Sequence, residues 1–297
     1  MESKILETLQ KKNLSENSVK LYMSILKNLN DKKEIKDLKF LAKPKKILDR
    51  IKDYKPTTQR NILIAIVSIL KALEDPLYKN YYDDMMKLNK SIEDETKKNE
   101  KTEQQEKNWM KWEDIINKFV DMNSKLKKSY SNISESQYDD LLDTVILSLY
   151  VCLPPRRNKD YLLMKVSKDG KNMTDTKYNY LDMKKKQFIF NNFKTKKAFG
   201  QQIIDIPDVC YNLLKKYLKY KKGDSDFLLV KFNGDELKSD NAITRRLNNI
   251  FDKNVSSSML RHIYLSDKYN GVKEEMKKDS QLMAHSTNQQ ADYIKND

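Results

Sequence analysis

The sequence predicts a mainly α-helical protein with one small antiparallel β-sheet, built as two domains joined by a charged linker. Three observations predict this fold. Apolar residues recur at helical spacing along most of the chain, a polar run interrupts them near residue 100, and short alternating segments replace them within residues 178–206. At 297 residues the chain also exceeds a typical domain of roughly 100 to 200 residues, which favours two domains.

The first domain, residues 1–90, is expected to be entirely helical. Ser15 is a candidate N-cap for an amphipathic helix, because apolar residues follow it at every third or fourth position. The most apolar stretch, residues 62–70, is too short to cross a bilayer and therefore predicts a buried helix. Helical patterns occupy residues 15–30, 39–53, 62–70 and 77–90.

Residues 91–108 are expected to be a charged linker. Between Ser91 and Lys107, Ile92 is the only apolar residue. Because such a stretch cannot bury apolar surface, it predicts an exposed segment, either an extended linker or a solvated helical extension. Both alternatives separate two folded units.

The second domain, residues 109–297, is expected to combine helices with the small antiparallel sheet. Trp109 and Trp112 open it as candidate core anchors. The alternating segments that predict strands are residues 178–183, 187–190 and 202–206, separated by lysine-rich turns. Helices are expected near residues 112–127 and 136–153, from Pro207 to Gly223, and over 241–253, 257–269 and 274–294.

The composition favours a polyanionic partner. The chain holds 58 Lys and Arg residues against 43 Asp and Glu, a formal net charge of +15. A lysine-rich composition imposed by an AT-rich genome would give the same excess. No run is apolar enough to span a bilayer and no secretion signal opens the chain, so an intracellular protein without a membrane partner is expected.

The rarer side chains narrow the chemistry. Cys152 and Cys210, the only cysteines, lie in apolar helix-like segments and are expected to be buried reduced thiols, which predicts no metal site. Lysine is the default cation here, so arginine is expected where a planar, bidentate, permanently charged group is needed. The seven arginines are Arg50, Arg60, Arg156, Arg157, Arg245, Arg246 and Arg261.

Three short motifs near the C-terminus carry the most information. They are Ser-Met-Leu-Arg-His at 258–262, Met-Ala-His-Ser at 283–286 and Ala-Asp-Tyr-Ile at 291–294. In this order they resemble the second signature box of the tyrosine recombinase (phage integrase) family, where an Arg, a His or Trp, and a nucleophilic Tyr follow one another. The resemblance assigns these roles to Arg261, His285 and Tyr293.

Residues 153–161, Leu-Pro-Pro-Arg-Arg-Asn-Lys-Asp-Tyr, resemble the first box of the same family, which supplies another catalytic arginine. The family places an acidic residue three positions after this arginine, and Asp160 gives that spacing from Arg157. Arg156 is then expected to be a flanking phosphate contact. The Pro-Pro-Arg sequence is similar to that of family variants in large DNA viruses of protists and their mobile elements. This resemblance implies a role in viral genome integration.

The family also places a lysine on a β-hairpin beside the scissile phosphate. Residues 193–197, Phe-Lys-Thr-Lys-Lys, lie between two predicted strands. The Lys-Thr sequence favours Lys194 as this lysine. Lys196 and Lys197 remain alternatives or DNA contacts. A solvated turn would explain at least two of the three lysines. Residues 14–22 and 57–61 resemble the family's helical core-binding domain, which makes Arg60 a candidate DNA contact.

The resemblance implies a metal-independent and ATP-independent reaction with no cofactor. Tyr293 would attack a phosphodiester, and Arg157 and Arg261 would bind its non-bridging oxygens. Lys194 would protonate the leaving 5′ oxygen while His285 donates a hydrogen bond to the phosphoryl group. The 3′-phosphotyrosine conserves the bond energy, so a second strand can be joined.

The implied partner is double-stranded DNA, bound by a homotetramer on two synapsed sites, with no small-molecule substrate. The protein would act wherever the element's DNA lies, in a host nucleus, a viral factory or a bacterial cytoplasm. Two other functions remain open. One is a monomeric type IB topoisomerase-like enzyme that nicks and reseals DNA, and the other is a DNA-binding protein with a decayed catalytic site.

Two departures from the family bear on that choice. Ser258 stands where a histidine is usual, and a serine can donate a hydrogen bond but cannot act as a base near neutral pH. His262 is expected to be structural rather than a replacement base. Tyr293 follows His285 by eight residues, one fewer than the commonest spacing. Lowered activity and a tighter loop are expected.

Overall fold

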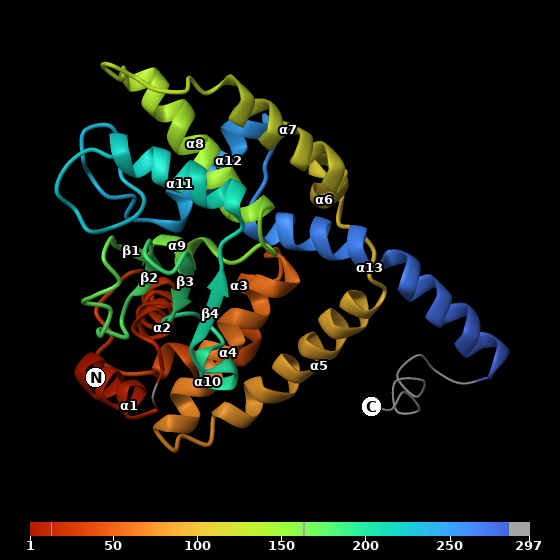
Figure 1. The fold of residues 1–297 in the computed structure, drawn as a ribbon. Helices are drawn as coiled ribbons and strands as arrows, with labels where there is room; N and C mark the ends of the chain where they lie inside the picture. Colours follow the sequence, from red (N-terminus) through yellow and green to blue (C-terminus); the bar gives the residue numbers. More distant parts are fainter. Residues whose placement is uncertain (13, 163, 285–297) are drawn as a thin grey trace. The chain divides into compact units, whose positions relative to one another are not determined.

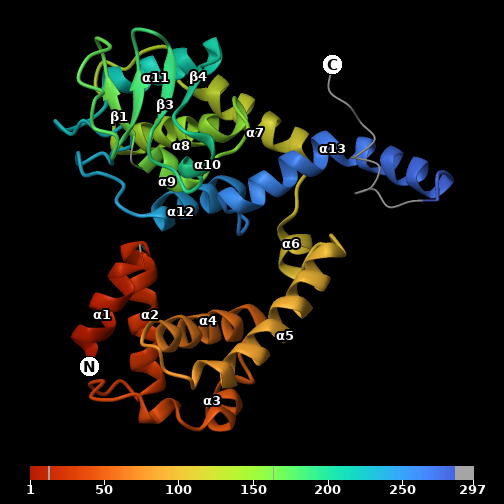
Figure 2. The same ribbon diagram turned by 90° about the horizontal axis from the view of Figure 1, so that it is seen from below.

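The computed structural model describes residues 1–12, 14–162 and 164–284 (Figures 1 and 2). The chain divides into two compact units, Met1–Lys101 and a second that begins at Thr102. The predicted mainly helical character is confirmed in both. His285 and Tyr293 lie outside the described residues.

The first unit is a bundle of helices that surrounds one apolar helix. Its elements are α1 (Glu2–Lys11), α2 (Glu16–Leu29), the short 3-10 helix η1 (Lys39–Leu41), α3 (Pro44–Ile51), α4 (Pro56–Ala72) and α5 (Tyr78–Lys97). Helix α4 packs against α1, α2 and α5, and its Leu63, Ile66 and Leu70 are fully buried. The predicted buried helix is confirmed, whereas α1 was not predicted.

Polar contacts close the ends of these helices. The Ser15 hydroxyl accepts the N–H of Ser18 at 3.2 Å, which is the N-cap expected for α2. At the other end of α2, the Arg50 guanidinium donates to the carbonyl oxygens of Leu29 and Asn28 at 2.9 and 2.7 Å. Arg50 therefore satisfies backbone oxygens that a helix end leaves free.

The polar stretch after residue 90 is largely helical and exposed. Helix α5 continues to Lys97, and α6 (Glu103–Asn108) opens the second unit with a capping box in which Thr102 and Gln105 bond reciprocally. An ion pair of 2.8 Å between Lys97 and Glu93 supports the last turn of α5. The solvated helical alternative thus describes residues 91–97.

The second unit combines helices with a four-stranded sheet. Its helices after α6 are α7 (Trp112–Lys125), α8 (Glu135–Val151), α9 (Asn158–Leu162), α10 (Lys196–Phe199), α11 (Asp208–Tyr220), α12 (Asp240–Phe251) and α13 (Ser257–Leu282). Its strands are β1 (Met164–Ser167), β2 (Asn179–Asp182), β3 (Gln187–Phe190) and β4 (Gln202–Asp205).

The sheet is mixed, so the prediction of a purely antiparallel sheet is wrong. Its order is β1-β2-β3-β4, and β1 runs parallel to β2 while the other neighbours are antiparallel. The three predicted strands are present, and β1 was missed because it has only four residues. The connection over residues 168–178 is long enough to return the chain in the same direction, which a tight hairpin cannot do.

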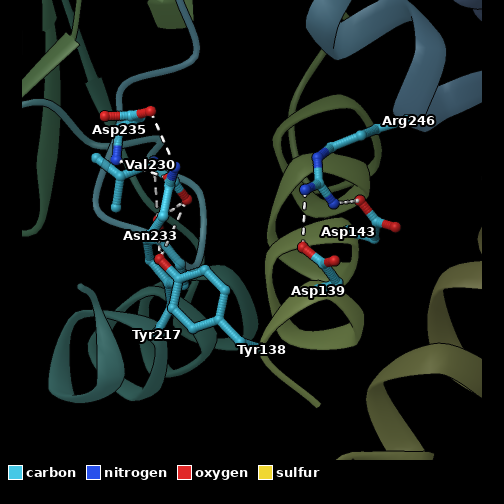
Figure 3. A network of polar contacts seen from close by, with 8 residues as sticks. All are labelled: Tyr138, Asp139, Asp143, Tyr217, Val230, Asn233, Asp235 and Arg246. Atoms are coloured by element: carbon cyan, nitrogen blue, oxygen red, sulfur yellow. Dashed lines mark hydrogen bonds and ion pairs between the residues drawn. The ribbon is translucent and has the colours of Figure 1, made fainter. Parts of the chain in front are cut away.

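Helix α8 is the centre of the second core. It is buried along most of its length, and α7, α11 and α12 pack against it. The hydroxyls of Tyr138 and Tyr217 both donate to the Val230 carbonyl oxygen, so these buried phenols are satisfied (Figure 3). Both cysteines are free thiols, as expected; Cys210 is buried and Cys152 is half-buried.

Helix α13 is one continuous helix within the described residues (Figures 1 and 2). The prediction of two separate helices over 257–269 and 274–294 is therefore wrong in placing a break between residues 269 and 274. Gly271 lies inside the helix, where a glycine costs about 1 kcal/mol relative to alanine without interrupting the hydrogen bonds. The first half of α13 is anchored by Tyr264, whose ring meets that of Trp112 edge-on at 5.1 Å. Trp112 is a core anchor as predicted, and Trp109 is half-buried beside the same core.

Candidate active site

The Arg156–Arg157 segment is a short loop between α8 and α9. Asn158 fixes this loop, because its side-chain oxygen accepts the Tyr150 hydroxyl at 2.7 Å. The Asn158 amide donates to the Asp240 carbonyl oxygen at 2.9 Å and to the Thr244 hydroxyl at 3.0 Å. The loop is therefore attached to α8 on one side and to α12 on the other, through buried polar groups that are costly to leave unpaired.

Asp160 is the centre of a cluster of three arginines. Its carboxylate is almost fully buried and forms an ion pair of 3.0 Å with Arg156 Nε. Burial raises the pKa of this carboxyl group. Three positive charges oppose that rise, those of Arg156, Arg157 and Arg261.

Arg157 and Arg261 form the part of this cluster that lacks a counter-charge of its own. Arg261 lies in the first turns of α13, where its Nε donates to the Ser257 carbonyl oxygen at 3.2 Å. Burial and then the neighbouring charge of Arg157 lower the pKa of Arg261. Among the described residues, no hydrogen bond or ion pair holds the Arg157 guanidinium. One carboxylate thus faces three guanidinium groups, and this excess charge favours an anion.

The Arg156 side chain is occupied by contacts with other residues of the protein. Beyond its ion pair with Asp160, its Nη1 donates to Gln202 Oε1 at 2.7 Å. Its guanidinium carbon lies 3.8 Å from the Phe190 ring centroid and 5.1 Å from that of Phe193. The expected role of Arg156 as a flanking phosphate contact stays a prediction, and Nη2 is the nitrogen without a described partner.

The three candidate lysines lie in the connection between β3 and β4. This connection follows the ladder pair Phe190–Gln202, and the two strands are antiparallel as a hairpin requires. Lys194 is exposed in a turn, while Lys196 and Lys197 open the short helix α10. No hydrogen bond or ion pair in the described part of the chain joins a lysine of this connection to the arginine pair. The choice of the general acid remains a prediction.

Ser258 and His262 flank Arg261 on the exposed side of α13. Ser256 caps this helix by accepting the N–H of Met259 at 3.2 Å, which leaves the Ser258 hydroxyl exposed and free of a capping role. Ser258 lies three residues before Arg261, so the two side chains share a helix face. His262 is also exposed, and no described contact supports a structural role for it.

The predicted nucleophile and its histidine come after this helix in the sequence. Helix α13 ends at Leu282, and Ala284 adopts a left-handed conformation with φ of 55°. His285 and Tyr293 come next in sequence but lie outside the described residues, so their roles remain predictions. Among the predicted catalytic residues that the structure describes, Arg157 and Arg261 come together from distant parts of the sequence, and Ser258 lies on the same helix face as Arg261.

Arg60, the predicted DNA contact of the first unit, is half-buried. Its Nε is buried without a hydrogen-bond partner among the described residues. A contact with DNA would therefore have to use the terminal nitrogens. This role stays a prediction.

Several residues of the site were missed from the sequence. Gln202 and Phe190 have no motif that connects them to Arg156, which precedes Gln202 by 46 residues. Asn158 follows Arg157 directly, but an isolated asparagine gives no signal of its hydrogen bonds. The described residues contain no group of three or more His, Cys, Asp or Glu side chains placed to hold a metal ion. None of their helices is both long and apolar enough to cross a membrane.

Comparisons with known proteins give a distant likeness among solved structures. No protein-family model matches the chain, and no curated protein sequence matches it. Among solved structures, the crystal structure of XerA recombinase aligns over 100% of this chain and 93% of that one, with 16% sequence identity and a TM-score of 0.37. At this level the likeness carries no inference about function, which depends on the residues described above.

Proposed function

We propose that this protein is a site-specific DNA recombinase that cleaves and rejoins DNA strands through a 3′-phosphotyrosine intermediate on Tyr293. The supporting observation is the pair formed by Arg157 and Arg261, half-buried and undercompensated beside Asp160. Two motifs far apart in sequence, each matched to a catalytic arginine by resemblance, bring their arginines close enough for the charge of Arg157 to act on Arg261. The net charge of +15 agrees with a DNA partner.

The two arginines would stabilise the charge that develops on the phosphate. In-line attack by the Tyr293 oxygen places additional negative charge on the non-bridging oxygens of the scissile phosphate. A planar guanidinium can donate two parallel hydrogen bonds to such oxygens, which a lysine cannot do. Because Asn158 fixes the loop that carries Arg157 and the Ser257 carbonyl oxygen holds Arg261 before DNA binds, the transition state would be stabilised with less reorganisation.

The remaining steps need a proton donor and further hydrogen bonds. The leaving 5′ oxygen would take its proton from Lys194, while His285 and Ser258 would donate hydrogen bonds to the phosphoryl oxygens. The phosphotyrosine bond then conserves the energy of the broken phosphodiester. A 5′ hydroxyl from a second duplex can reverse the attack without ATP and exchange the strands.

The proposal includes an assembly and a biological setting. Residues 1–90 would bind the DNA core and residues 109–297 would catalyse, with four subunits on two synapsed duplexes. The natural substrate would be the ends of the mobile or viral element that encodes the protein. The protein would then act wherever that DNA is kept inside the cell.

A covalent-adduct assay tests the proposal. The protein is incubated with nicked duplexes that carry the sequences flanking its gene, and the products are separated on denaturing gels. We expect a protein–DNA adduct that is absent in Tyr293→Phe and retained in Tyr269→Phe, a matched change at an exposed tyrosine of α13.

The outcomes separate three functions. Joined recombinant strands support the recombinase. Relaxation of supercoiled DNA without recombinant strands would indicate a nick-and-reseal enzyme. DNA binding without any adduct would contradict catalysis and leave a DNA-binding protein.

A further inference from the structure

Arg156 contacts both ends of the β3–β4 connection. Phe190 is the last residue of β3 and Gln202 is the first of β4, and the two are partners in the ladder. Arg156 stacks on Phe190 at 3.8 Å and donates to Gln202 at 2.7 Å. One side chain therefore spans the base of the connection over residues 191–201.

The same guanidinium also contacts the connection itself. Phe193, the residue directly before Lys194, is buried, and its ring centroid lies 5.1 Å from the Arg156 guanidinium carbon. Lys194 is exposed. The backbone before the lysine is thus anchored while its ammonium group remains free to reach a bound phosphate.

Arg156 also contacts the cluster that contains Arg157 and Arg261. Arg156 is bound to Asp160, whose carboxylate also interacts with Arg157 and Arg261. With Arg156 exposed by only 16% and Asp160 by 4%, this ion pair is shielded from water, so its geometry is strongly constrained.

A second set of hydrogen bonds runs in parallel. The Asn179 side-chain oxygen accepts the backbone N–H groups of Asn191 and Asn192 at 2.8 and 2.7 Å. Its amide nitrogen donates to the Asp160 carbonyl oxygen at 2.6 Å. Two independent side chains therefore connect the start of the β3–β4 connection to Asp160.

From these contacts we infer that Arg156 is a positioning residue, which holds the Lys194 segment in register with the Arg157–Arg261 pair. The inference rests on the proposed function, because it assigns Lys194 the role of general acid. It gives Arg156, the first arginine of the Pro-Pro-Arg-Arg motif, a task distinct from phosphate binding. Lysine could not replace it, since an ammonium group cannot stack on Phe190 and reach both Asp160 and Gln202.

The chemical step makes this role measurable. A bond forms between the Tyr293 oxygen and phosphorus, and the phenolic proton passes to water. The bond between phosphorus and the 5′ oxygen breaks with its electron pair on that oxygen, which takes a proton from Lys194. If the leaving atom is sulfur, it departs as a thiolate without a proton, since thiols have a pKa of about 8.5.

The first experiment compares single-turnover cleavage of two nicked duplexes, one with the natural 5′ oxygen and one with a 5′-bridging sulfur. Loss of general acid catalysis costs about 10²-fold to 10⁴-fold, so we expect Arg156→Met and Lys194→Ala to lose at least about 10²-fold on the oxygen substrate. Both should approach the wild-type rate on the sulfur substrate. Arg157→Lys, which affects the non-bridging oxygens, should be slow on both.

Two outcomes of this comparison overturn the inference. One is an Arg156→Met enzyme that is equally slow on both substrates, which would indicate general damage to the site. The other is an Arg156→Met enzyme as fast as wild type on the oxygen substrate. The Gln202→Leu variant, which keeps the ion pair with Asp160, should show a smaller loss that is likewise restored by sulfur.

The second experiment needs no DNA and separates this inference from the proposed function. Amide hydrogen exchange of residues 191–201, followed by mass spectrometry, should accelerate in Arg156→Met and less in Gln202→Leu. Arg246→Met, which removes two ion pairs elsewhere in the unit, should leave this segment unchanged. Unchanged exchange in Arg156→Met overturns the inference, even if the enzyme cleaves DNA. A wild-type protein that forms no DNA adduct contradicts the proposed function instead.

Discussion

Two clusters in the second unit are both built from arginine and aspartate side chains, but the sums of their charges have opposite signs. Arg246 donates to Asp143 at 2.6 Å and to Asp139 at 2.8 Å, so one cation meets two carboxylates (Figure 3). At the candidate active site, three guanidinium groups surround the single carboxylate of Asp160. The first cluster is satisfied by the protein alone. The second leaves positive charge for a ligand, and this difference separates a structural arginine from one kept for function.

The largest effect is expected from replacing an arginine of the undercompensated pair. Arg157→Lys keeps the charge but loses the bidentate geometry, so DNA cleavage should fall by about 10²-fold to 10³-fold. Arg245→Lys, an exposed arginine on α12, is the control and should cleave normally. Cleavage rates at saturating protein measure this effect. An equal loss in Arg156→Lys on the substrate with a 5′-bridging sulfur would contradict the assignment of Arg157 as the catalytic arginine.

Removing the satisfied arginine should instead affect stability. Arg246→Met leaves two carboxylates without their cation, and because the pair is partly exposed we expect a loss of about 2 kcal/mol in the free energy of unfolding. Urea denaturation measures it. The double variant Arg246→Met, Asp143→Leu should recover part of the loss, since no buried charge then remains unpaired at that position. Folded Arg246→Met protein should cleave DNA at the normal rate.

The pH dependence of the same cluster follows from Asp143. Burial raises the pKa of Asp143 to about 6, although Arg246 opposes the rise. Because the folded-state pKa lies above the ordinary value of 3.8 for an aspartate, the folded protein binds this proton more tightly than the unfolded chain. The stability from this group is therefore present below pH 3.8 and is lost as the pH rises through about 6.

Two measurements check this behaviour. Carboxyl NMR should give Asp143 a pKa of about 6 in the wild-type protein and a higher one in Arg246→Met. Between pH 7 and pH 5, unfolding free energies should rise more in the wild type than in Asp143→Asn. A parallel change in the two proteins would contradict the raised pKa.

The smallest expected effect is a change in stability whose sign differs between the two clusters. Arg157→Met removes the repulsion between Arg157 and Arg261, so it should stabilise the free protein by up to about 1 kcal/mol, the scale of a partly exposed charge pair. This sign is opposite to that of Arg246→Met. Urea denaturation of Arg157→Met and of the exposed control Arg245→Met would reveal it. A clear destabilisation by Arg157→Met would mean that this arginine has a structural partner.

Most helices of this protein were predictable because their signals are local. The apolar spacing of residues 62–70 and the cap at Ser15 act within one or two turns, and both are confirmed. Errors occurred where local signals were weak. Strand β1 was missed, and a break was expected between residues 269 and 274, where the helix instead continues through Gly271, because glycine disfavours a helix without forbidding it.

The sequence by itself determined the helical character, the charge excess and the candidate chemistry, in which the roles of Arg157, Arg261 and Tyr293 stay predictions. Only the tertiary structure decided which arginines are already satisfied. Arg246 lies 103 residues from Asp143, and Arg156 lies 46 residues from Gln202. The physical reason is that electrostatic compensation depends on distance in space. A sequence motif can name the arginines, but the fold decides which of them remain available to bind a phosphate.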